Sequence, residues 1–313
     1  MSSVDRAHVP VHPGYFADPF VLRTTRDGYV AYGTFPPDAP DRTEADTREF
    51  RVMTSPDLEH WTLRGGALEP LPVEAGTDYW APEVAEVDGR FYMYFSVGHG
   101  FHDHHLRVAV SQDPVGPFVD AGVDLTPSAL FAIDPHPFRD EDGTWYLFYA
   151  HDVLDGDRVG TMLAVDRLVS MTEVAGEPTT ILRPDDDWQI FLRQREMYGK
   201  VHDWHTLEGA FVRRRGDRYY CFYSGGNWEN ETYGVAWAEA DHPLGPWRRP
   251  AVTRRVLHTV EGWALGPGHN SVVTDPRGQD AIVYHAWDDD LVRRRMYVSP
   301  LLWEDDGPHV PGF

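Results

Sequence analysis

The chain of 313 residues has little that would tie it to a membrane, a nucleic acid or a disulfide framework. It has no run of about 18 apolar residues, so it predicts no membrane-spanning helix. Its one cysteine, Cys221, excludes an intrachain disulfide and is interpreted as a small buried hydrophobe. The formal net charge of −22 argues against nucleic acid or anionic membrane as a partner, because polyphosphate binding needs basic patches. A neutral ligand remains compatible with this charge.

The N-terminus has no apolar segment followed by a cleavage site, so we expect a cytoplasmic protein. The content of 42% hydrophobic and 13% aromatic residues is enough for a large core. All-β folds of this length often form one domain. We therefore expect a single domain over residues 1–313.

The chain contains a repeat. A polar or acidic residue leads into a short apolar run at five places, and we align Asp18, Glu83, Asp134, Glu208 and His269 as equivalent positions. A Gly or Asp turn and an aromatic strand follow each one; Asp-Gly between two β-rich runs is a strong hairpin signal. The turns are Asp27-Gly28, Asp88-Gly89, Asp142-Gly143, Gly216-Asp217 and Gly278-Gln279. Five copies of an antiparallel meander predict an all-β fold, a five-bladed β-propeller.

The propeller geometry turns this repeat into a candidate site. The innermost strands of the blades line the central axis, so the five equivalent side chains should converge on one volume. That volume would hold four carboxylates and one histidine, and like charges placed together raise at least one pKa. Since strand pairing has no use for such a cluster, we interpret it as functional.

Carboxylates in a funnel rimmed by Trp and Tyr are what glycoside hydrolysis needs. Glu208 stands between an apolar residue and Gly209, a setting that raises a carboxyl pKa, so we predict that it is the protonated acid. Asp18 would be the base. Asp134 is a third carboxylate, able to hold up the pKa of the acid and to orient it.

Three further features of the sequence could contribute to the site, and two of them allow more than one interpretation. Trp80 either stacks on a flat ligand face or packs between blades. Residues 151–206 exceed what the strands of one blade need, so we expect them to contribute a loop over the site. Four histidines crowd one segment with a spacing that can bind a metal, although a hydrated or rim-lining loop is favoured; they are His99, His102, His104 and His105.

The chain resembles glycoside hydrolase family 43, a family of five-bladed propellers. The resemblance covers about residues 13 to 303. It rests on Ala17-Asp18-Pro19, Trp80-Ala81-Pro82-Glu83, Ile133-Asp134-Pro135, Glu208-Gly209, Gly268-His269-Asn270-Ser271 and Tyr284-His285.

The resemblance implies an inverting mechanism, with Asp18 as general base, Glu208 as general acid and Asp134 as the residue that adjusts the pKa of the acid. It also implies an oligosaccharide substrate bearing L-arabinofuranose or D-xylose.

By the same resemblance, Trp80, Glu83, Ile133 and His269 are candidate substrate-binding residues. A calcium ion is implied in the central channel, with His269 as its candidate ligand. The family usually has Asp after Trp-Ala-Pro, whereas this chain has Glu83.

No β-sandwich follows Trp303, which favours an arabinofuranosidase over a β-xylosidase. The missing export signal favours exo action on oligosaccharides over an endo-arabinanase. A non-catalytic sugar-binding propeller is a further possibility, although it would be expected to have lost an acid. A fructan hydrolase would carry Asn-Asp-Pro-Asn, Arg-Asp-Pro and Glu-Cys signatures, and none occurs here.

Overall fold

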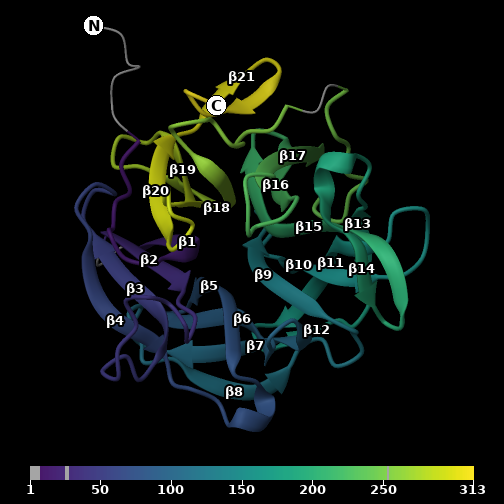
Figure 1. The fold of residues 1–313 in the computed structure, drawn as a ribbon. Helices are drawn as coiled ribbons and strands as arrows, with labels where there is room; N and C mark the ends of the chain where they lie inside the picture. Colours follow the sequence, from purple (N-terminus) through teal and green to yellow (C-terminus); the bar gives the residue numbers. More distant parts are fainter. Residues whose placement is uncertain (1–7, 25–27, 252–253) are drawn as a thin grey trace, which may run out of the picture.

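The computed structural model describes residues 8–24, 28–251 and 254–313, which form five β-sheet blades around a central axis (Figure 1). The prediction of an all-β, five-bladed propeller is confirmed. Helix among these residues is limited to two short 3-10 turns, η1 (Val73–Ala75) and η2 (Asp187–Gln189). No helix in the described ranges is long and apolar enough to cross a membrane.

Blades I and II are four-stranded antiparallel sheets, and in each the strands pair in chain order from the axis outward. Blade I consists of β1 (Ala17–Thr24), β2 (Gly28–Thr34), β3 (Glu49–Ser55) and β4 (Thr62–Leu68). Blade II consists of β5 (Asp78–Val87), β6 (Arg90–His99), β7 (His102–Ser111) and β8 (Val119–Asp124).

Blades III, IV and V each have three main strands. Blade III contains β9 (Ala132–Arg139), β10 (Trp145–Val153) and β11 (Gly160–Ser170), with β12 (Glu173–Val174) and β13 (Thr179–Leu182) at its edge. Blade IV contains β15 (Lys200–Arg215), β16 (Arg218–Gly225) and β17 (Gly234–Ala240). Blade V contains β18 (Leu265–Thr274), β19 (Asp280–Trp287) and β20 (Arg294–Pro300), followed by the hairpin of β21 (Leu302–Glu304) and β22 (Gly307–His309).

The segment that precedes β1 closes the ring by running along β20. The Val11 amide donates to the Met296 carbonyl at 2.9 Å, and the Phe16 amide donates to the Arg294 carbonyl at 2.8 Å. The chain therefore connects blade V to blade I through backbone hydrogen bonds as well as through packing.

The predicted Asp-Gly turn between β5 and β6 is a two-residue hairpin turn. Asp88 and Gly89 both have positive φ, 51° and 74°, as a type I′ turn requires. The short turn fixes the pairing register, so the aromatic side chains of β6 fall on the faces that the neighbouring blades cover. Asp27, in the corresponding turn of blade I, lies outside the described residues.

Each innermost strand carries a β-bulge at the same height. The bulge residues are therefore the positions that correspond from blade to blade. Its first residue has φ between 46° and 58° in every blade; these residues are Asp18, Ala81, Asp134, Gly209 and His269. The predicted alignment is therefore wrong by two residues at Glu83 and by one at Glu208. A bulge inserts an extra residue and changes the direction of nearby side chains. In each blade the bulge turns side chains toward the axis.

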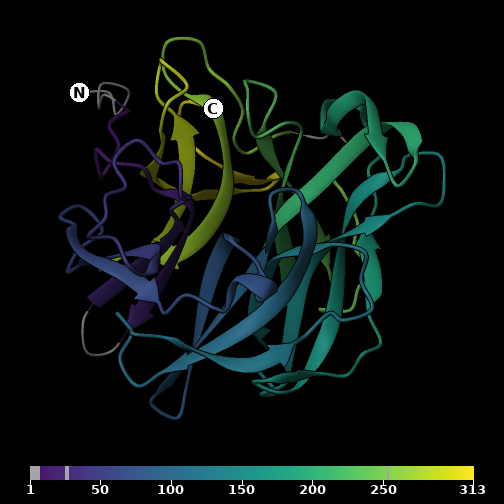
Figure 2. The same cartoon turned by 60° about the horizontal axis from the view of Figure 1, so that its bottom comes forward.

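The segment between blades III and IV is ordered structure rather than the expected loop. β14 (Ile190–Met197) pairs with the first part of β15 as an antiparallel hairpin. In Figure 2 this green hairpin rises at the upper right, beyond the blades. Its height above the sheets allows it to form one wall of a site at that end of the axis.

Apolar side chains fill the space between blades below the bulges. Phe20 of blade I and Phe211 of blade IV face each other across the axis, with ring centroids 6.5 Å apart. Full burial of such a side chain contributes about 1.5–3 kcal/mol, so this contact resists separation of the blades. Cys221 is fully buried in blade IV, which confirms its interpretation as a small core residue.

Candidate active site

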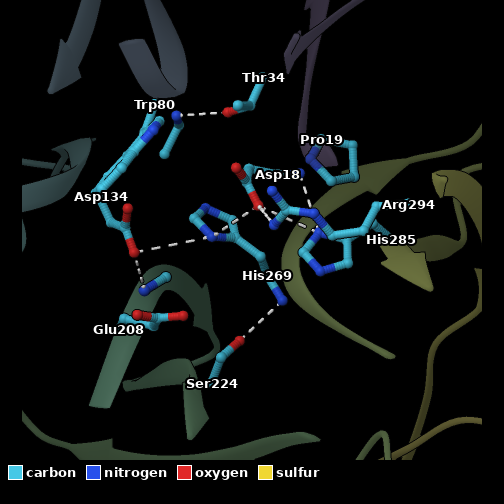
Figure 3. Close-up of polar contacts among 12 residues, drawn as sticks. Asp18, Pro19, Thr34, Trp80, Asp134, Glu208, Ser224, His269, His285 and Arg294 are labelled. Carbon is cyan, nitrogen blue, oxygen red and sulfur yellow. Dashed lines mark hydrogen bonds and ion pairs between the residues drawn. The ribbon is translucent and has the colours of Figure 1, made fainter. Parts of the chain in front are cut away.

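A cavity of about 440 Å³ lies over the bulges, and six of the seven predicted site residues line it. They are Asp18, Trp80, Ile133, Asp134, Glu208 and His269. Figure 3 shows His269 between Asp18 and Asp134, with Trp80 beside Asp134. The volume falls within the range of small-molecule sites.

Side chains of preceding blades hold the bulges in place. The Ala81 amide donates to Thr34 Oγ1 and the His269 amide donates to Ser224 Oγ, both at 2.8 Å. The Asp18 amide donates to His285 Nδ1 at 3.0 Å. A non-glycine residue at positive φ costs free energy, so these hydrogen bonds, drawn in Figure 3, help to stabilise the strained backbone.

Blade III departs from this arrangement. The position that pairs with Ile133 is occupied by Ala150, which has no hydrogen-bonding side chain. The Gly209 amide donates instead to Asp134 Oδ2 at 2.9 Å. Asp134 thus fixes the backbone next to Glu208, which is what a residue that orients the acid must do.

Asp18 lies beside the Arg294 guanidinium and two buried histidines. Its Oδ1 accepts a hydrogen bond from Arg294 Nη1 at 3.1 Å and lies 3.2 Å from His285 Nδ1 and 3.6 Å from His269 Nδ1. Burial opposes its ionisation, but the adjacent Arg294 guanidinium holds the pKa of Asp18 well below its usual range. Asp18 is therefore an ionised carboxylate, ready to accept a proton.

Glu208 lies in an apolar and anionic environment. Burial and the Asp18 charge raise its pKa to about 7, although the Tyr233 hydroxyl donates a hydrogen bond to Glu208 Oε1 at 2.6 Å, which acts in the opposite direction. Glu208 is thus largely protonated below pH 7 and can donate that proton. Burial and the neighbouring carboxylates raise the pKa of Asp134 as well, since Glu208 and Asp134 cannot both ionise freely.

Glu83 does not line the cavity, so the prediction that it binds substrate does not fit its position. It lies two residues beyond the blade II bulge, and its Oε2 accepts a hydrogen bond from His136 Nδ1 at 2.6 Å. His136 Nε2 in turn accepts from the Val212 amide, which fixes the proton on Nδ1. Glu83 therefore links blades II, III and IV below the site.

Trp80 packs against neighbouring rings and also lines the cavity, so its stacking on a ligand stays a prediction. One ring face stacks on His104 at 3.7 Å between centroids, and the side chain lines the cavity. His104 Nε2 bonds to the Gly100 carbonyl, while His105 Nδ1 bonds to the Thr126 carbonyl. The histidine-rich segment thus supports the cavity wall.

Sequence reasoning missed Arg294, Tyr15 and Tyr233. Arg294 Nε donates to the Tyr15 hydroxyl at 2.9 Å, and its guanidinium carbon lies 4.4 Å from the centre of the Trp228 ring. Arg294 is 276 residues from its partner Asp18, and Tyr233 is 25 residues from Glu208. Arg294 and Tyr233 lie outside the repeated phrase, so no local signal marked them, while Tyr15 stands three residues before Asp18 in the phrase but was given no role.

The donor set around His269 does not fit a calcium ion held by protein ligands. In the described ranges, no group of three or more His, Cys, Asp or Glu side chains is arranged to hold a metal ion. Calcium needs six to eight oxygen ligands, whereas the nearest carboxylate, Asp18, is engaged by Arg294. The predicted calcium ion stays untested, and we derive no chemical step through it.

Comparison with known proteins agrees with this site. The sequence profile described as Glycosyl hydrolases family 43 matches residues 7–308. The chain is 31% identical over 302 residues to the β-D-galactofuranosidase xynD of Aspergillus niger, covering 91% of this chain and 77% of that protein. It is 26% identical over 318 residues to an extracellular exo-α-(1→5)-L-arabinofuranosidase of Streptomyces avermitilis, covering 95% of this chain but 61% of that protein.

A solved structure shows the same fold. The crystal structure of a thermostable family-43 glycoside hydrolase superposes with a TM-score of 0.83 and 30% identity, covering 98% of this chain and 96% of that one. The profile match spans nearly the whole chain and includes all three acids at the cavity. The chain therefore belongs to glycosyl hydrolase family 43 and is a glycoside hydrolase.

Proposed function

We propose that this enzyme is an exo-acting, inverting glycosidase that releases L-arabinofuranose from arabinan- or arabinoxylan-derived oligosaccharides. The observation that carries the proposal is that one cavity holds two carboxyl groups with opposite neighbours, Asp18 bonded to the Arg294 guanidinium and Glu208 bonded only to the Tyr233 hydroxyl among the described residues. The pKa of Asp18 is held well below its usual range, and that of Glu208 is raised to about 7. Glycoside hydrolysis needs such a pair.

In the proposed reaction, the ionised Asp18 takes a proton from a water molecule as that water attacks the anomeric carbon. Glu208 gives its proton to the glycosidic oxygen as the bond to the leaving group breaks. Each sugar then leaves with a free hydroxyl group, and the anomeric configuration is inverted. Asp134 holds the Gly209 amide beside the acid, and burial together with the Glu208 carboxyl group raises the pKa of Asp134.

The choice of sugar draws on the relatives and on the cavity. The named relatives act on furanosides. Trp80 and the Trp228–Trp287 pair supply aromatic surface in the cavity wall, suited to the apolar faces of a sugar. L-Arabinofuranose is our first choice. D-Galactofuranose is the second candidate, because the relative at 31% identity is a galactofuranosidase.

The substrate test also separates this activity from those of a β-xylosidase and an endo-arabinanase. Rates are measured on aryl α-L-arabinofuranoside, β-D-galactofuranoside and β-D-xyloside, and then on arabino- and xylo-oligosaccharides. We expect the arabinofuranoside to be hydrolysed with the highest kcat/KM and arabino-oligosaccharides to release monosaccharide. A preference for xyloside, or shorter oligomers without monosaccharide, would contradict the proposal. Proton NMR of the first-formed sugar reports inversion.

A further inference from the structure

The cavity continues past the three acids along the β14–β15 hairpin. Trp204, Thr206 and Glu208 all line it, and they alternate along β15, so they share one face of that strand. In the proposed reaction the leaving group lies beside Glu208, which protonates it. A leaving group therefore extends along Trp204 toward the hairpin.

Arg195 stands at this end of the cavity with its side-chain donors free. Its guanidinium carbon lies 4.9 Å, 5.5 Å and 5.9 Å from the ring centres of Phe191, Trp204 and Phe101. Within the part of the chain that the structure describes, this guanidinium makes no hydrogen bond and no ion pair. A half-buried guanidinium with five unused N–H donors is suited to a polar ligand.

Asp152 lines the same part of the cavity and provides acceptors. Its Oδ1 accepts from Thr161 Oγ1 at 2.9 Å, and its Oδ2 accepts from the Tyr198 hydroxyl at 2.7 Å. Each carboxylate oxygen keeps a lone pair for a further donor. Tyr198 and Gly199, both at positive φ, form the hairpin turn, so the Tyr198–Asp152 bond ties the hairpin to blade III.

We propose that Arg195 and Asp152 form a leaving-group subsite that binds a neutral sugar residue. The inference rests on the proposed function and makes it specific: the preferred substrate carries a sugar as its leaving group. The guanidinium fork donates to two neighbouring hydroxyl groups, Asp152 accepts from another hydroxyl, and Trp204 provides an apolar wall. Asp152 and the chain charge of −22 disfavour an acidic sugar.

The test compares Arg195→Ala with wild type on two substrates. On α-1,5-linked arabinobiose, kcat/KM should fall about 10- to 100-fold, the effect of losing hydrogen bonds to a charged group. On an aryl α-L-arabinofuranoside, which offers no hydroxyl groups to Arg195, it should change less than about threefold. Arg193→Ala is the matched control: Arg193 is on the same strand but is exposed and paired with Asp203 at 3.0 Å. It should leave both rates within about twofold.

A second variant protects the test against misfolding. Arg195→Lys keeps the charge and the aliphatic stem but loses the two-pronged donor geometry, so it should lose activity on the disaccharide only. Equal losses on both substrates, or no loss on the disaccharide, would overturn the subsite. If wild type hydrolyses no glycoside, the proposed function fails on its own. Calorimetric titration with arabinobiose then decides the subsite: weaker binding by Arg195→Ala supports it, and equal binding overturns it.

Discussion

The two sides of the cavity hold carboxyl groups of the same kind in opposite electrostatic settings. On the blade V side, Asp18 faces Arg294, His269 and His285. On the blade IV side, Glu208 faces Tyr233 and the carboxylates of Asp134 and Asp18, and it has no cation in hydrogen-bond contact among the described residues.

This difference teaches that the neighbours, and not the repeat, assign the roles. Both acids come from innermost strands at a bulge, Asp18 as the first bulge residue and Glu208 as the residue before it, so a place at the bulge does not by itself separate acid from base. A guanidinium contact lowers the pKa of Asp18, while burial without such a contact raises the pKa of Glu208, as the proposed roles of base and acid require. Substitution of Asp18, of Glu208 or of the neighbouring Arg294 should therefore change the kinetics in different ways.

Asp18→Asn should have the largest effect. The amide cannot take a proton from water, so kcat/KM should fall about 10³- to 10⁴-fold. The loss should be similar on oligosaccharides and on aryl glycosides, because the attack of water is needed whatever the leaving group is. Steady-state rates on both substrates check this, and a loss confined to oligosaccharides would assign Asp18 to another role.

Glu208→Gln should have a large effect that depends on the substrate. A natural glycoside has a poor leaving group and needs protonation, so its turnover should drop about 10²- to 10⁴-fold. An activated aryl glycoside should lose less, because its leaving group departs without a proton. Comparing the two rates checks this, and identical losses would argue against general acid catalysis.

Arg294→Gln should reduce the pKa difference between Asp18 and Glu208 while both carboxyl groups remain. Without the guanidinium, burial dominates and the pKa of Asp18 rises. Since Asp18 acts in its ionised form, the acidic limb of the pH–rate profile should move to higher pH. The rate at pH 7 should fall about 10-fold or more, because the raised pKa leaves less of Asp18 in its ionised form. A profile whose acidic limb does not move would contradict the role given to Arg294.

Removal of divalent cations should have the smallest effect. Arg294 supplies the positive charge next to Asp18, so prolonged chelation should change kcat and Tm only slightly, with a rate change below about twofold. Activity that is lost on chelation and restored by Ca²⁺ would instead support the ion implied by the family resemblance.

The fold and the acids are predictable because their signals are local. Turns such as Asp88-Gly89 and the repeated aromatic strands lie within a few residues of each other, and they are enough to define blades. The repeated phrase also locates Asp18 and Glu208, the proposed catalytic pair, in the cavity even though the predicted register is wrong at Glu208.

What the sequence does not reveal depends on bulges and on distant contacts. A bulge adds one residue to a strand and so changes which of the following side chains face the cavity. The sequence does not show where the bulge lies, and the predicted alignment therefore places Glu83 at the cavity. In the structure Glu83 bonds to His136 below the cavity. Arg294 reaches Asp18 only after the ring has closed. The pKa difference between Asp18 and Glu208 depends on such distant contacts. The residues next to Glu208 in the sequence predict only that its pKa is raised.

The pH dependence of kcat/KM for the wild-type enzyme tests the central claim most directly, because it reports the protonation of the free enzyme. Glu208, with its pKa raised to about 7, must keep its proton, so activity should fall as pH rises through about 7. Asp18, with its pKa held well below the usual range, must lose its proton, so no acidic limb should appear above about pH 4. Constant activity up to pH 9, or an acidic limb near pH 6, would contradict this account.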